Sequence, residues 1–105
     1  MIVVIFEVQP IAGRAERYFD LAAELRPELE KQDGFISIER FESLATPGKF
    51  VSISFWRDEA AVAAWRGHGD HTAAQALGKR EIFADYRITV AEALRSYGPE
   101  GTAPE

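Results

Sequence analysis

The residues most capable of chemistry lie together in one short segment, residues 63–75, with the sequence AAWRGHGDHTAAQ. This segment contains Trp65, Asp70 and both histidines of the chain, His68 and His71. An imidazole can accept or donate a proton near neutral pH, and an indole adds a flat apolar surface with one N–H donor. The segment is therefore the first candidate for a site that moves a proton on an apolar ligand.

His71 is the candidate base. Asp70 is expected to cap a helix that runs to about Leu77, which puts His71 in the first turn of that helix. The helix dipole disfavours a cationic imidazole at this end, so it favours the neutral form that can accept a proton, although Asp70 would act in the opposite direction. The alternative is a solvent-exposed histidine at a helix start.

Trp65 is predicted to form a wall of the same pocket, and its alternative role is that of a core side chain. Gln75 follows His71 by four residues, so the two reach the same side of a helix and Gln75 is predicted to contact the substrate. Six residues separate Trp65 from His71, a turn of about 600° that would place them on different faces of one continuous helix. Gly67 and Gly69 are expected to break the helix and bring both side chains to one cavity.

Two further residues are candidates for substrate binding. His68 lies between two glycines in a predicted loop, where exposure to solvent is the alternative. Arg87 shares its strand register with Asp85, and it could stabilise an oxyanion in a cavity or pair with an acid at the surface. His68, Asp70 and His71 lack a third nitrogen ligand nearby, so we predict no metal site.

The hydrophobic pattern predicts an α+β fold, a ferredoxin-like split βαβ arrangement with a four-stranded antiparallel sheet and helices on one face. The expected strands and helices, in chain order, are strand 2–8, helix 14–32, strands 35–44 and 50–57, helices 59–66 and 70–77, and strand 83–95. A helix over 90–97 is an alternative for the end of the last strand. We expect residues 1–97 to form a single domain and residues 98–105 to be a flexible C-terminal tail.

Local signals mark the ends of these elements. Pro47 and Gly48 fit a type II turn, and Gly34 supplies a left-handed residue after the first helix. Asp58 is expected to cap the helix at 59–66 and Gly78 to end the helix at 70–77. Pro27 should kink the first helix or start a new turn.

Composition excludes several function classes. The 105 residues carry a net charge of -5, which argues against nucleic acid or an anionic membrane as the main partner. The absence of cysteine excludes disulfides and thiolate chemistry. The apolar run 2–6 is too short to span a membrane, and we expect a cytoplasmic protein. Strands 2–8 and 50–57 are apolar in both registers, which predicts a homodimer packed sheet to sheet.

The segment 55–90, FWRDEAAVAAWRGHGDHTAAQALGKREIFADYRITV, resembles the antibiotic biosynthesis monooxygenase family of dimeric α+β barrel proteins. The resemblance extends over roughly residues 1–97, and its shared positions are Phe55-Trp56, Asp58-Glu59, Trp65, His71, Gln75, Gly78, Phe83 and Asp85-Tyr86. It implies a ligand pocket between helices and sheet in each protomer. It also implies a monooxygenase that acts with O2 on an aromatic or quinol-like substrate and needs no cofactor.

Two other functions stay open on the same scaffold. One is a non-catalytic ligand-binding or stress-related protein. The other is a haem-binding or haem-degrading relative, whose triad is an Asn on the first strand, a Trp and an iron-ligating His ten residues after that Trp. Trp65 fits the second element, but Gln75 occupies the histidine position and the chain contains no Asn. A haem held by His68 or His71 instead remains an alternative, since one axial His can hold iron.

Overall fold

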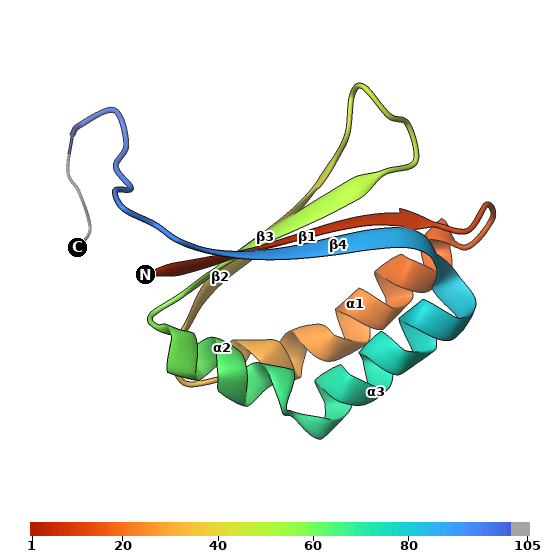
Figure 1. The fold of residues 1–105 in the computed structure, drawn as a ribbon, viewed down its shortest axis with the longest axis horizontal. Helices are drawn as coiled ribbons and strands as arrows, with labels where there is room; N and C mark the ends of the chain where they lie inside the picture. The colour runs from red at the N-terminus through yellow and green to blue at the C-terminus, as the bar shows by residue number, and fades with distance from the viewer. Residues whose placement is uncertain (102–105) are drawn as a thin grey trace.

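The computed structural model describes residues 1–101, apart from the side chains of Asp70 and His71. Its four-stranded antiparallel sheet has the strand order β2-β3-β1-β4, and the helices cover one face of it (Figure 1). The strands are β1 (Ile2–Pro10), β2 (Phe35–Glu42), β3 (Phe50–Trp56) and β4 (Phe83–Glu92). The helices are α1 (Ala15–Glu30), α2 (Glu59–Arg66), α3 (Gly69–Leu77) and the π-helical turn η1 (Gly78–Ile82). The predicted ferredoxin-like α+β fold is confirmed.

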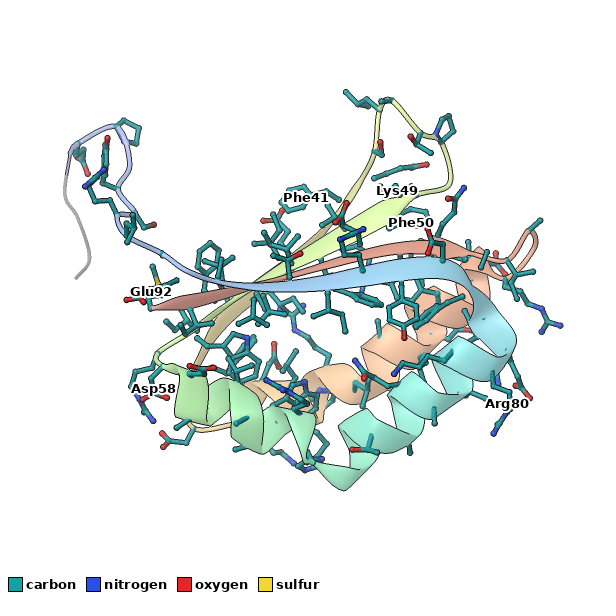
Figure 2. All side chains as sticks on the ribbon, in the orientation of Figure 1. Phe41, Lys49, Phe50, Asp58, Arg80 and Glu92 are labelled. Atoms are coloured by element: carbon teal, nitrogen blue, oxygen red, sulfur yellow. The ribbon has the colours of Figure 1, made fainter. Side chains whose placement is uncertain are left out.

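The two faces of the sheet differ because successive side chains of a strand point to opposite sides. The face toward the helices carries Val8 and Trp56, which are almost fully buried. The opposite face, called the open face below, carries apolar side chains that no helix covers, namely Val3, Ile5, Phe41, Val51, Ile53 and Phe55. Figure 2 shows Phe41 on this side, away from the helices.

The core between sheet and helices consists of two separate clusters of buried side chains. One contains Trp56 and Trp65 with Leu29, and Leu25 and Val4 pack against it. The second is formed by Val8, Tyr18 and Ile82. The clusters lie at different ends of β3, since Trp56 ends that strand and Phe50, which packs on the second cluster, begins it.

The local turn signals are confirmed at three places, one of them Gly34 with its left-handed φ of 89°. The Lys49 N–H donates to the Thr46 carbonyl at 3.1 Å, and Gly48 has a φ of 84°, as position i+2 of a type II turn requires. Asp58 caps α2, because its Oδ1 accepts from the Ala61 N–H at 2.9 Å.

Two predicted helix boundaries are wrong. The helix expected to follow a cap at Asp70 begins at Gly69 instead, and the Thr72 N–H donates to the His68 carbonyl at 2.9 Å. The Asp70 side chain itself lies outside the described residues. Gly78 does not end the helical segment, which continues through η1 to Ile82. A Cβ at Gly78 would lie 2.5 Å from the Phe83 ring, so this glycine serves close packing instead of a stop. The first helix runs through Pro27 to Glu30 as one element, and the kink predicted at Pro27 stays a prediction.

The chain after β4 extends away from the sheet, on the side where the N-terminus lies (Figure 1). Residues 93–101 contain no helix, so the alternative helix over 90–97 does not form and β4 occupies its first residues. Residues 102–105 of the predicted tail lie outside the described residues. None of the helices in the described part of the chain is long and apolar enough to cross a membrane.

A clasp of five residues joins the start of β2 to the start of α2. The Arg57 guanidinium bonds the Asp33 carboxylate through both Nη atoms, at 3.1 and 3.2 Å, and its Nε donates to Asp58 at 3.1 Å. The hydrogen bond from Arg57 lowers the pKa of Asp33, and the Ala61 N–H lowers the pKa of Asp58. Gly34 belongs to the same clasp, because its carbonyl accepts a hydrogen bond from the backbone N–H of Arg57 at 2.7 Å. The clasp fixes the position of the helix that carries Trp65.

The substitution Gly34→Ala tests the closeness of this contact. Gly34 has a φ of 89°, and an added Cβ would lie 2.6 Å from the Ala61 Cβ. The control Gly48→Ala has a similar φ of 84° with no atom within 4 Å. We expect Gly48→Ala to lower the free energy of unfolding in urea by about 1 kcal/mol for the left-handed backbone alone. Gly34→Ala should lower it by about 1–3 kcal/mol more, through overpacking; equal losses would show that the contact relaxes freely.

Candidate functional site

A cavity of about 640 Å³ lies between the sheet and the helices, in the layer of side chains visible in Figure 2. It occupies the space between the two core clusters, with Val4 and Phe6 of β1 on one side and Leu25 of α1 on the other. Its volume falls within the range of small-molecule sites, and its walls are largely apolar. It is therefore large enough and apolar enough to hold an organic ligand.

Two serines of β3 form part of the cavity lining on the sheet side. Ser52 and Ser54 alternate with Val51 and Ile53 along the strand, so they face the helices and are 8% and 6% exposed. Ser54 Oγ accepts a hydrogen bond from the Trp56 indole at 2.9 Å. Within the described residues the Ser52 side chain makes no such bond, which leaves its hydroxyl available to a ligand.

Trp65 and Gln75 both line the cavity, as predicted. The break between them is real, because α2 ends at Arg66 and α3 begins at Gly69. Trp65 is 7% exposed and belongs to the first core cluster, so it is at once a core side chain and a cavity wall.

The two histidines differ in what the structure says of them. The His68 ring lies 5.2 Å from the Trp65 ring at an interplanar angle of 33°, and it is partly exposed. His68 therefore packs against the wall and is not among the lining residues. The backbone of His71 lies in the first turn of α3, as predicted, but its side chain lies outside the described residues. Its role as base stays a prediction.

The structure separates Arg87 from this cavity. Arg87 pairs in register with Glu7, on the open face of the sheet. It lines a different, polar hollow of about 240 Å³ together with Lys49 and Asp85. Lys49 Nζ lies 3.3 Å from Glu7 Oε1 in the same hollow. Arg87 thus belongs to a surface cluster of mixed charge, the alternative noted for it above.

Arg40 and Tyr18 are cavity residues that the sequence analysis missed. The Arg40 Nε donates to the Tyr18 hydroxyl at 3.2 Å, and the guanidinium carbon lies 5.0 Å from the centre of the Tyr18 ring and 5.7 Å from that of Phe19. A signal for Arg40 was present, since it shares the helix-facing register of β2 with Ile38. A charged residue in the apolar register of a strand is an exception to the usual pattern.

This arrangement can exclude water from an apolar ligand and offer it a few polar contacts. Among its polar groups are the Gln75 amide, the Ser52 hydroxyl and the Arg40 guanidinium, each from a different element. Among the described residues, no group of three His, Cys, Asp or Glu side chains is placed to hold a metal ion. The cavity suits a reaction whose chemistry resides in the substrate and needs a base, a dry wall and a donor.

Comparison with known proteins gives a family match and two curated relatives. The family model described as Antibiotic biosynthesis monooxygenase matches residues 1–77. The jasmonate monooxygenase ABM of Pyricularia oryzae is 41% identical over 96 residues, which are 91% of this chain and 45% of that protein. The uncharacterized protein YqjZ of Bacillus subtilis is 31% identical over 81 residues, 77% of this chain and 63% of that protein. The chain thus spans about half to two thirds of the length of these relatives.

Solved structures share the fold at lower sequence identity. A candidate antibiotic biosynthesis monooxygenase from Deinococcus radiodurans superposes with a TM-score of 0.82 at 21% identity, covering 93% of this chain and 97% of that one. The protein Rv0793 of Mycobacterium tuberculosis also gives 0.82, at 20% identity, and covers 92% and 98% of the two chains. These likenesses support the fold.

The two serines provide a test of the cavity lining. Ser54→Ala should lower the free energy of unfolding by about 1–3 kcal/mol, because it leaves the buried Trp56 indole N–H without its acceptor. Ser52→Ala breaks no hydrogen bond within the protein and should change it by less than about 0.5 kcal/mol. Urea denaturation of both variants measures the difference. Equal losses would mean that Ser52 also has a structural partner.

Proposed function

The chain belongs to the antibiotic biosynthesis monooxygenase family, and we propose on this premise that it oxygenates a small apolar molecule held in the cavity between sheet and helices. The proposed substrate is aromatic or quinol-like, and the proposed oxidant is O2 without metal, flavin or haem. The observation that carries the proposal is the apolar cavity walled by Trp65 and Gln75, next to the helix turn that contains His71.

The proposed reaction draws all of its electrons from the substrate. A base removes a proton from a hydroxyl or an activated CH2 group, and the resulting anion passes one electron to O2. Recombination of the two radicals forms the new C–O bond. One oxygen atom then remains on the ring carbon as a carbonyl, and the other leaves as water. The four electrons that reduce O2 come from the substrate, so no external reductant is needed.

Each candidate residue has a distinct proposed role. His71 is the base, and it precedes Gln75, a lining residue, by four positions on α3. Residues so spaced share one side of a helix. Trp65 excludes water from the substrate, and Gln75 orients the substrate. His68 supports the Trp65 ring from behind.

Oxygen consumption tests the reaction and the base together. With anthrones, dihydroxynaphthalenes and jasmonate as the panel, wild type should consume O2 in the presence of a chelator and without added flavin. Jasmonate is included because a relative 41% identical is named for it. His71→Ala should lower kcat by about 100-fold or more, since a general base contributes roughly 100- to 10,000-fold. The neighbouring exposed Thr72→Ala is the control and should keep the wild-type rate.

Two results would contradict these roles. Equal rates in wild type and His71→Ala would mean that the imidazole is not the base. A ligand-induced rise in Tm without O2 uptake for any member of the panel would favour the alternative function, a protein that binds small molecules without catalysis.

We also propose that two copies of the chain pair through the open face. Its central side chains, among them Val51 and Ile53, are apolar and have no helix over them, and Phe41 is 43% exposed. A contiguous apolar surface of this kind marks an interaction site, and a flat face of one chain can meet its own copy about a twofold axis. The predicted cytoplasmic location stays a prediction.

Light scattering after size exclusion tests the pairing. Wild type should elute at twice the 11.7 kDa mass of one chain. Ile53→Glu places an unpaired carboxylate at the centre of the contact, where burial without a partner costs several kcal/mol, and should give the monomer mass. Thr72→Glu, on the helix side, should remain dimeric. A monomeric wild type at micromolar concentration would contradict the proposal.

A further inference from the structure

The charged residues that line the cavity are mostly cations, although the whole chain is acidic. They are Arg26, Arg40, Arg66 and a single acid, Glu39. Glu39 pairs in register with Ile53, so its side chain belongs to the open face. The cavity therefore presents positive charge in a chain whose net charge is -5.

Of these three arginines, only Arg40 is half-buried. Arg26 is exposed and already pairs with Glu30 at 2.8 Å, and Arg66 is exposed on α2. Arg40 makes no salt bridge with any acid in the part of the chain that the structure describes. A half-buried guanidinium without an acid keeps donors for a further partner, so a ligand that supplies an anion would gain charge-assisted hydrogen bonds there.

The guanidinium of Arg40 is held in place by aromatic side chains. It lies over the rings of Tyr18 and Phe19, and its Nε is bonded to the Tyr18 hydroxyl. The two Nη groups of Arg40 make no hydrogen bond to the described residues, so their parallel N–H donors can bind a ligand. Parallel Nη donors match the two oxygens of a carboxylate. The Ser52 hydroxyl, directly across from Arg40 in the β2–β3 register, is a further donor.

We propose that Arg40 anchors the ligand of this cavity and that the ligand is an apolar molecule with one carboxylate. This inference rests on the proposed small-molecule role of the cavity. The carboxylate binds at the Tyr18 end, beside the second core cluster, and the apolar body extends toward Trp65 in the first. Arg40 is thus a specificity-determining residue, and the part of the ligand that reacts lies away from its charge.

Calorimetric titration with matched acid and amide pairs tests the anchor. The probes are 2-naphthoate with 2-naphthamide and 4-phenylbutyrate with 4-phenylbutanamide, at pH 7.5 and low salt. Wild type should bind at least one acid tenfold or more tightly than its amide. Arg40→Gln should weaken binding of that acid by at least tenfold and binding of the amide by less than twofold. Arg40→Lys, which keeps the charge but loses the paired donors, should fall between.

Arg26→Gln is the matched control, because Arg26 lines the same cavity but is exposed and already paired. It should change the affinity for either probe by less than twofold. The Tm of each variant is measured alongside. If Arg40→Gln weakens acid and amide equally, Arg40 only packs against Tyr18 and the inference is wrong.

Further outcomes separate this inference from the proposed reaction. Acids that bind wild type no more tightly than their amides would overturn the anchor, while O2 uptake with neutral anthrones would still support the monooxygenase. A slower turnover of neutral anthrones in Arg40→Gln, with acid binding unchanged, would assign Arg40 to the reaction and overturn the anchor. Acid selectivity lost in Arg40→Gln, without O2 uptake on any substrate, would support the anchor and contradict the monooxygenase.

Discussion

The structure depends on two small polar residues of β3 that face the helices. At these positions large apolar side chains would fill the layer between sheet and helices. Ser52 and Ser54 occupy the helix-facing register between Phe50 and Trp56, which belong to different core clusters. Large apolar side chains at these two positions would join the clusters into one continuous core. With serines there, the protein lacks the stability that dispersion contacts and buried apolar surface of such side chains would supply. The cavity thus follows from the alternation of serines and apolar residues along β3. The two core clusters pack at either end of it.

The walls of the cavity follow from how the helices are attached to the sheet. The clasp around Arg57 and Gly34 fixes the start of α2, and Ala61 of that helix packs so closely on Gly34 that no side chain fits between them. At the other end, η1 leads from α3 directly into β4, with Gly78 pressed against the Phe83 ring. The junction at residues 67–68 lies between these two fixed ends. It therefore sets how Trp65 and Gln75 converge on the cavity.

The sequence predicts the features that local chemistry decides, such as the turn at Pro47-Gly48 and the cap at Asp58. It fails where packing decides and not the residue type: Gly78 lies against the Phe83 ring, and this contact explains the glycine better than a helix stop does. The same distinction applies to the residues of the cavity. Trp65 and Gln75 reach the cavity because a helix break aims them, whereas Arg40 becomes a cavity residue only when α1 brings Tyr18 and Phe19 to it. Strand alternation predicts that Arg87 and Asp85 share one face of the sheet. It does not predict whether that face is the one that the helices cover.

The same alternation links the cavity to the open face, since β3 contributes to both. Ser52 and Ser54 line the cavity, and Val51, Ile53 and Phe55 between and beside them point to the other side. Packed interiors transmit strain because they leave few voids and side chains cannot shift independently. Burial of the open face against a second copy would hold the backbone of β3 from behind, and with it the serines that face a ligand.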